Sequence, residues 1–203
     1  MIFQAGNLKL HKSVGIFSLP EGPPEDGGTC PGCTEVCARI CYARKPTKMG
    51  FKGSINYRKR MLHATRDPGF VAMVIREVQD RGFKKVRVHE AGDFYSQSYL
   101  NKWIHIALGL PEIPFLAFTR NFGLDYSQVP PNLRIYYSGD SANAHRIPKG
   151  PQGWIWERGH PRPIKGAKVC PPVDSKNGHI KYCGDTCTFC WVGKQKHVIF
   201  PQH

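Results

Sequence analysis

The cysteines are the residues of this chain whose type and spacing most clearly suggest chemistry. All eight lie in two stretches near the ends of the sequence, and none lies between residues 42 and 169. The first stretch has the spacing C-x2-C-x3-C-x3-C, and the second ends in C-x3-C-x2-C. The candidate metal ligands are Cys30, Cys33, Cys37 and Cys41 in the first stretch, and Cys170, Cys183, Cys187 and Cys190 in the second.

The cellular compartment decides how these thiols are interpreted. No apolar run approaches the roughly 20 residues of a membrane span, and the first residues lack the apolar core of a signal peptide. We therefore expect an intracellular protein without a membrane partner. In a reducing compartment, cysteines this closely spaced are typical of metal binding, whereas a secreted miniprotein would use them for disulfides.

The sequence leaves the metal open between iron–sulfur and zinc. Zinc sites usually pair two short knuckles, while a dense run such as 30–41 is more typical of a [4Fe-4S] cluster. Eight thiols could ligate two clusters, one cluster and one zinc ion, or one cluster shared by both ends. The spacing of 183–190 also resembles the cluster loop of radical S-adenosylmethionine enzymes, in which three cysteines leave one iron open for that cofactor. A fully ligated cluster favours a structural or redox role instead.

Between the cysteine stretches, helical and strand patterns alternate. Apolar periodicity predicts helices over 67–82 and 96–111, and β-branched runs predict strands over 86–89, 114–120, 132–141 and 153–157. Asp67 and Ser96 are the expected N-caps, and Leu108 is expected on a buried helix face. Such alternation is typical of a parallel sheet with crossover helices. We predict a single α/β domain over 1–203, with metal-binding segments at 29–42 and 170–191.

Charged side chains follow three of the predicted strands. Glu90 and Asp93 follow the first, Arg120 the second and Asp140 the third. Ligands gather at the carboxyl ends of strands in parallel sheets, so these four are the candidate catalytic residues. The alternative is that they are caps and loop residues, which Asp often is.

The formal net charge is +14 and the pI is about 9.6. Residues 43–60 are basic and contain no acidic residue, with Phe51 and Tyr57 interleaved as candidate stacking platforms. This pattern favours nucleic acid as a partner, against the alternatives of a solvated basic face or a counter-charge for an anionic cluster. The candidate nucleic-acid-binding residues are Arg44, Lys45, Lys48, Lys52, Arg58, Lys59 and Arg60. Residues 197–203 are expected to be apolar packing with a loose end.

Four segments, followed by the cysteine-rich tail, resemble the phage gene-product-88-like family. They are "TCPGCTEVCARICYARK", "VRVHEAGDFYSQSYLNKWIHIA", "PFLAFTR" and "IYYSGDS", and the resemblance covers roughly 15–192. Cys41, Tyr42 and Ala43 are also similar to the cluster loop of phage proteins related to spore photoproduct lyase. The resemblance implies a viral protein in the cytoplasm of an infected bacterium. It also implies a full or partial (β/α) barrel, TIM barrel-like, whose two cysteine-rich segments meet at a metal cluster.

Three functions follow as expectations. The first is an iron–sulfur protein with one or two [4Fe-4S] clusters that binds nucleic acid through its basic surface, the cluster being structural or redox-active. The second is a radical S-adenosylmethionine-type enzyme acting on nucleic acid. The third is a nucleic-acid-binding module stapled by zinc. The sequence decides neither whether the protein is an enzyme nor its oligomeric state.

Overall fold

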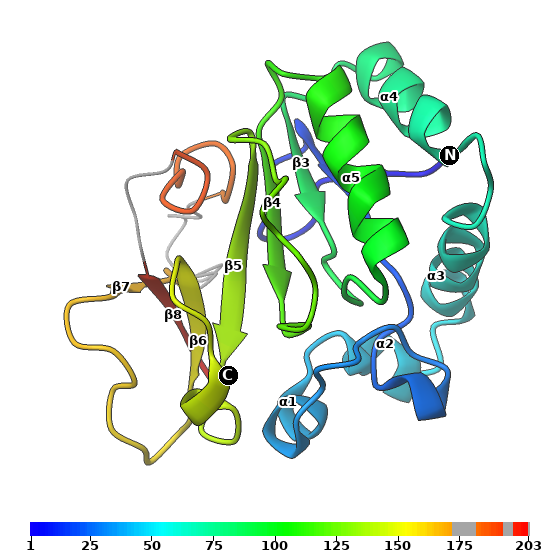
Figure 1. Ribbon diagram of the computed structural model, residues 1–203. Helices are drawn as coiled ribbons and strands as arrows, with labels where there is room; N and C mark the ends of the chain where they lie inside the picture. Colours follow the sequence, from blue (N-terminus) through cyan, green and yellow to red (C-terminus); the bar gives the residue numbers. More distant parts are fainter. Residues whose placement is uncertain (172–181, 193–196, 203) are drawn as a thin grey trace.

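The protein is built around one eight-stranded, mostly parallel sheet (Figure 1). The computed structural model describes residues 1–171, 182–192 and 197–202. The strand order is β1-β2-β3-β4-β5-β6-β8-β7, in which β1 pairs antiparallel with β2 and all other neighbours are parallel. The mixed α/β architecture expected from the sequence is confirmed. The strands are β1 (Gln4–Ala5), β2 (Val14–Ile16), β3 (Lys85–Val88), β4 (Phe115–Thr119), β5 (Leu133–Gly139), β6 (Gln152–Trp156), β7 (Lys168–Val169) and β8 (His197–Pro201).

Helices cover one face of the sheet and the carboxyl ends of its strands. Helices α3, α4 and α5 pack on the face formed by residues such as Val86, Val88 and Phe115, around a core centred on Trp103. Helices α1 and α2 lie at the carboxyl ends of the strands (Figure 1). None of the helices in the described ranges is long and apolar enough to cross a membrane. The helices are α1 (Glu35–Ile40), α2 (Arg44–Lys48), α3 (Lys52–Ala64), α4 (Phe70–Asp80) and α5 (Gln97–Gly109), with short 3-10 turns η1 (Pro24–Asp26) and η2 (Ala144–Arg146).

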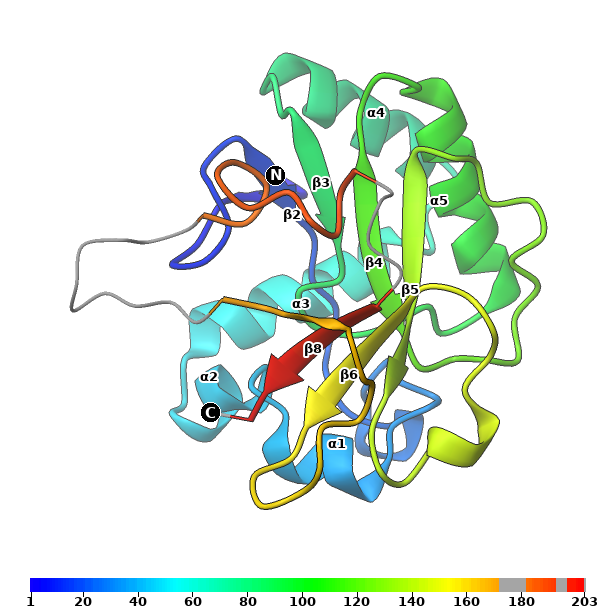
Figure 2. The same cartoon turned by 90° about the vertical axis from the view of Figure 1, so that its left-hand side faces the viewer.

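The opposite face of the sheet is covered by the C-terminal part of the chain (Figure 2). The rings of Phe118 in β4 and Phe200 in β8 are 5.3 Å apart, although the two strands are three positions apart in the sheet. In a flat sheet that separation is about 14 Å, so the sheet must curve. Gly153 of β6 permits this, since a Cβ there would lie 2.7 Å from Phe118. In the described residues β1 and β7 remain as separate edges, and the full barrel implied by the resemblance is not confirmed.

The predicted helices exist, but two of their details are wrong. Asp67 does not cap α4; its carboxylate accepts from the Gly69 N–H at 2.6 Å, in the turn before the helix. Leu108 is 59% exposed, and Ile106 and Ala107 are buried instead. Ser96 is confirmed as the N-cap of α5, accepting from the Tyr99 N–H at 3.3 Å.

The largest correction concerns the end of the chain. Residues 197–203 were expected to be apolar packing with a loose end; the apolar packing is confirmed, but residues 197–201 form a strand, β8, between β6 and β7. Val198 and Ile199 are buried there. Strand β8 therefore completes the sheet and carries part of the second core.

Candidate functional site

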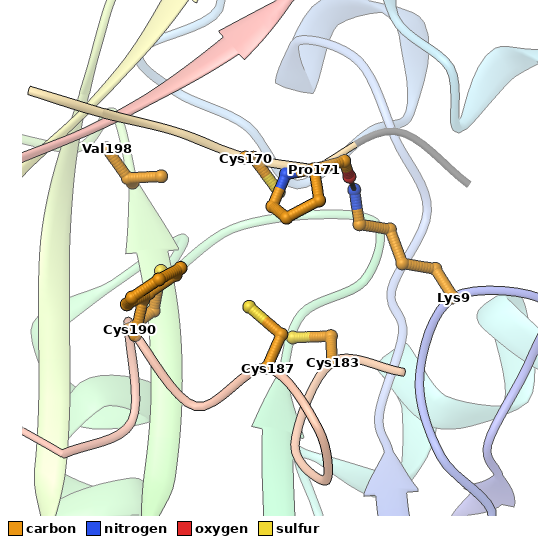
Figure 3. A pocket seen from close by; sticks show the side chains of 8 residues that line it. Lys9, Cys170, Pro171, Cys183, Cys187, Cys190 and Val198 are labelled. Atoms are coloured by element: carbon orange, nitrogen blue, oxygen red, sulfur yellow. Dashed lines mark hydrogen bonds between the residues drawn. The ribbon is translucent and has the colours of Figure 1, made fainter. Parts of the chain in front are cut away.

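The four C-terminal cysteines, which we call the C-terminal thiol site, line one small pocket (Figure 3). Cys183 and Cys187 lie next to each other in one loop, and Cys170 approaches from the strand on the opposite side. The remaining lining residues include Lys9, Phe189 and Val198. All eight cysteines of the chain are free thiols in the structure. The site therefore brings four sulfur donors to one place from two separated segments.

Backbone pairing positions these thiols. The Cys183 N–H donates to the Lys9 carbonyl at 2.8 Å, and the Cys170 N–H donates to the Ile199 carbonyl at 2.7 Å. Gly184, next to Cys183, has φ +89°, and a Cβ there would lie 2.6 Å from a Val14 methyl. The loop can thus pack directly on β2 because a glycine occupies this position.

Burial makes two of the C-terminal thiols, Cys183 and Cys190, weaker acids. It raises the pKa of the Cys190 thiol to about 12 and raises the pKa of Cys183 as well. The guanidinium of Arg87, 4.3 Å from the centre of the Phe118 ring, acts in the opposite direction on both thiols. The Trp191 indole N–H also donates to the Cys183 sulfur at 3.4 Å. These neighbours stabilise negative charge on the sulfurs, which is the form that ligates metal.

The four N-terminal cysteines form a second group, the N-terminal thiol site. Cys30 and Cys33 lie in the turn before α1, Cys37 lies within α1, and Cys41 is its C-cap. Electrostatic interactions connect Cys33 and Cys37 with each other and with Cys41, and Cys30 with Cys37, while the Cys33 thiol donates to the Thr34 carbonyl at 3.7 Å. The spacing of the sequence therefore corresponds to a real grouping of side chains.

A buried network fastens this cysteine loop to the strand ends. Asp140, which is fully buried, accepts from the Arg120 guanidinium at 2.6 Å and from the Thr34 hydroxyl at 2.6 Å. Thr34 is also the N-cap of α1 and accepts from the Cys37 N–H at 3.0 Å. Gly32 lies so close to Arg120 that a Cβ would be 2.0 Å from its carbonyl oxygen. Two of the predicted catalytic residues thus position the thiols.

The same network sets the charge around the N-terminal thiols. Burial raises the pKa of Cys37 to about 12, and the Arg120 guanidinium opposes that shift. Arg120 and Arg44 both favour the thiolate of Cys33, although burial leaves its pKa raised. Arg120 and Arg44 therefore offset part of the negative charge that these sulfurs would carry as thiolates, while Asp93 acts in the opposite direction on Cys30 and Asp140 on Cys37.

The two thiol sites are separate. The N-terminal site lies with α1 at the carboxyl ends of the strands, and the loop 182–192 lies toward their other ends (Figures 1 and 2). Among the described contacts, every thiol–thiol interaction stays within one site. The expected meeting of the two segments at one cluster is therefore not observed. Within residues 1–171, 182–192 and 197–202, no three Cys, His, Asp or Glu side chains are placed to hold a single metal ion.

The other two predicted catalytic residues divide between the network and a neighbouring ion pair. Asp93 is buried and accepts from the Arg120 N–H at 2.7 Å, and burial raises its pKa to about 6. Glu90 instead lies 3.8 Å from Arg58 and accepts from the Ser18 hydroxyl at 3.3 Å. Asp93, Arg120 and Asp140 are thus brought together as expected, while Glu90 belongs to the ion pair beside them.

The predicted nucleic-acid-binding residues differ in exposure. Arg58 is buried, with ion pairs to Glu21 at 2.7 Å and to Glu90, and Arg44 is half-buried and pairs with Asp26 at 3.4 Å. Tyr57 is also buried and donates to the Ile2 carbonyl at 2.6 Å, so it cannot stack on a base as expected. The exposed members, which we call the basic surface, are Lys45, Lys48, Lys52, Lys59 and Arg60 on α2 and α3.

Sequence reasoning missed several residues that shape the two sites. Thr34 carried a recognisable signal, because Thr followed by a short helix is a common N-cap. Arg87 and Lys9 carried none, since their proximity to the C-terminal thiols depends on how the tail folds over the sheet. Glu157, buried and 3.4 Å from Arg39 of α1, likewise depends on contacts between distant segments.

Comparisons with known proteins give a family match for this chain. The family model described as Gene product 88 matches residues 1–196. Two relatives, each named Gene 88 protein, come from Mycobacterium phage L5 and Mycobacterium phage D29, and both are 29% identical, over 144 and 145 residues. The matched region covers 64% of this chain and 60% of each relative. Comparison with solved structures finds no match. Because the family model covers almost every residue from the first strand to the C-terminal thiol site, the chain belongs to the Gene product 88 family.

Proposed function

We propose that this chain is an iron–sulfur protein with two separate four-cysteine sites, one at each end of its sheet. One observation carries the proposal: Cys170 and the three cysteines of the 183–190 loop line a single pocket. A four-thiol donor set is the set that [4Fe-4S] clusters use. The chain's own residues would supply the thiolates, and Lys9, Arg87 and Arg120 would offset the negative charge.

The dense spacing of the cysteines in 30–41 supports a cluster over a single zinc ion. Sulfurs bound to zinc at about 2.3 Å in a tetrahedron lie about 4 Å apart. A cubane spreads its ligands more widely, and four thiolates at each site would leave no iron open. This favours a structural or redox role.

Iron, zinc and acid-labile sulfide per chain test this proposal, after anaerobic purification. We expect about eight iron and eight sulfide in the wild type, and about four of each in C187A/C190A. T186A, which changes an exposed residue between Cys183 and Cys187, is the matched control and should keep the wild-type content. Zinc without sulfide would overturn the iron–sulfur proposal and favour the zinc-stapled module.

A second candidate function is supported by the position of the N-terminal thiol site. Its cysteines follow β2, the first parallel strand, and lie at the carboxyl ends of the strands. Substrates of parallel α/β enzymes bind at that edge, as a radical S-adenosylmethionine-type reaction would require. Electron paramagnetic resonance of the reduced protein discriminates the two functions: a spectrum changed by S-adenosylmethionine would favour the enzyme, and an unchanged spectrum the fully ligated cluster.

The proposed partner of the basic surface is nucleic acid. Its five cations are exposed, and the net charge of the chain is +14. Polyanion binding by such a surface is driven by neutralised phosphates and released counterions. With relatives in mycobacteriophages, the proposed place of action is the cytoplasm of an infected bacterium.

Charge removal tests the basic surface. K45Q/K48Q is expected to weaken binding to nucleic acid of any sequence and to reduce the dependence of log Kd on log salt by about one per lysine. R76Q/K84Q removes the same charge from α4 and the amino end of β3, where both side chains are exposed. Equal losses in the two variants, measured by fluorescence anisotropy across a salt series, would mean that binding follows net charge rather than this surface.

A further inference from the structure

We propose that residues 42–52 form a stacking platform for single-stranded nucleic acid, with Tyr42 and Phe51 as the base-stacking rings. This inference rests on the proposed nucleic-acid binding and names the kind of nucleic acid that the surface recognises. It comes from an unusual grouping of exposed apolar side chains in the most basic part of the chain.

Three large apolar side chains are exposed within ten residues of one another. Tyr42 is 63% exposed, Met49 60% and Phe51 53%. The other large hydrophobic residues exposed in the described part of the chain are scattered from one end to the other: Met1, Leu8, Met73, Leu108, Phe189 and Val192. Exposed apolar residues that gather on one surface mark an interaction site, whereas single ones need no explanation.

Tyr42 is anchored through its side chain, and Phe51 through its backbone. The Tyr42 hydroxyl donates to the Glu90 carbonyl, which anchors one end of a side chain whose remaining surface is exposed. Phe51 is the N-cap residue of α3, and its carbonyl accepts from the Ser54 N–H at 3.1 Å and the Ile55 N–H at 3.3 Å. The Tyr42 side chain and the backbone at Phe51 are therefore ordered before a ligand binds, which lowers the entropic cost of stacking.

Cations adjoin the two rings along the chain, and two of the acids on neighbouring segments, Asp26 and Glu21, are already paired. Lys45 and Lys48 lie on α2 between Tyr42 and Phe51, and Lys52 follows Phe51 directly. Asp26 is paired with Arg44. Glu21 is paired with Arg58, and its other carboxylate oxygen accepts from the Thr47 hydroxyl at 2.5 Å. A phosphate backbone would thus meet positive charge with little opposing negative charge.

The combination of exposed aromatic rings and lysines favours single-stranded nucleic acid over a duplex. Bases in a duplex are stacked on one another and present only their edges, whereas unpaired bases can lie flat on an aromatic ring between cations. Because Tyr42 directly follows Cys41, the C-cap of α1, a strand bound here would run beside the N-terminal thiol site.

Binding of a labelled oligothymidylate, compared with a labelled duplex of equal length, tests the inference by fluorescence anisotropy. The wild type is expected to bind the single strand more tightly. F51A and Y42A should each weaken single-strand binding by about five-fold or more, the effect of losing one stacked base, and leave duplex binding unchanged. L108A is the matched control, because Leu108 is equally exposed at the far end of α5.

The possible results separate this inference from the function on which it rests. Equal affinity for single strand and duplex, or equal losses in F51A and L108A, would overturn the platform while leaving nucleic-acid binding in place. No binding to either probe would overturn both. Quenching of intrinsic fluorescence by the bound strand that is reduced specifically in Y42A would add direct support for stacking.

Discussion

D140N is expected to lower the free energy of unfolding by about 3–5 kcal/mol, because it leaves the buried Arg120 guanidinium without a counter-charge. The Asp140 side chain is fully buried and that of Arg120 is 8% exposed. The same change removes the charged acceptor of the Thr34 hydroxyl, so the cap of α1 is weakened as well. Under the proposed iron–sulfur function, we therefore expect D140N to lose iron from the N-terminal thiol site and to keep it at the C-terminal one.

Urea unfolding and iron content per chain measure these two effects. D26N is the matched control, since it breaks the Asp26–Arg44 pair, whose Asp26 side chain is 63% exposed; an exposed pair contributes less than about 1 kcal/mol. R120M/D140L, which replaces both charges with apolar groups, should recover part of the lost stability. Equal destabilisation by D140N and D26N would contradict a structural role for this ion pair.

Acid sensitivity traced to His89 is the second large effect that we expect. His89 is buried among aromatic rings, its Nε2 lies 2.8 Å from the Tyr99 hydroxyl, and its Nδ1 has no hydrogen-bond partner among the described residues. Burial, with a smaller contribution from Arg87, lowers the pKa of His89 from 6.5 to about 3. Between these values the unfolded chain binds a proton that the folded chain does not, so the free energy of unfolding falls as the pH falls.

The size of this effect follows from the linkage between proton binding and folding. Between pH 7 and pH 5 the wild type should lose about 2 kcal/mol through His89 alone. H89N removes the titrating group and suits the backbone, because φ is +64° at this position and Asn tolerates that region. The difference in stability between wild type and H89N should therefore shift in favour of H89N on acidification. H105N, at an exposed histidine of α5, should follow the wild type. A parallel pH dependence in wild type and H89N would contradict the assignment.

Much of the sheet could be predicted from the sequence, because its central elements have strong local patterns. The apolar periodicity of 70–80 and 97–109 and the β-branched runs of 85–88 and 115–119 correspond to α4, α5, β3 and β4. Helix α3 was hidden, since its buried stripe of Tyr57, Arg58 and Met61 is narrow and lies in a basic, polar run. Strand β8 depends on pairing with β6 and β7, which no local pattern reveals.

The candidate site could likewise be predicted only in part from the sequence. Parallel pairing of β3, β4 and β5 brings their carboxyl ends together, so the approach of Asp93, Arg120 and Asp140 was foreseeable. The ion pairs themselves could not be predicted, because they depend on the conformation of loops. Arg58 of α3, for example, pairs with Glu21 and Glu90 and is therefore not part of the basic surface. The separation of the two thiol sites also depends on the path of the tail across the sheet.

The position of β8 imposes an order on how the protein matures. Strand β7 pairs with β8, and Cys170 is held through the Ile199 carbonyl. During synthesis β8 leaves the ribosome after the other strands of the described residues, so β6 lacks its β8 partner and Cys170 lacks this backbone support until residues 197–201 have emerged. The N-terminal thiol site needs no residue beyond Glu157 for the contacts described above. If the two sites bind metal as proposed, the contacts that hold the first site would form during translation, whereas those that hold Cys170 would form only after β8 has emerged.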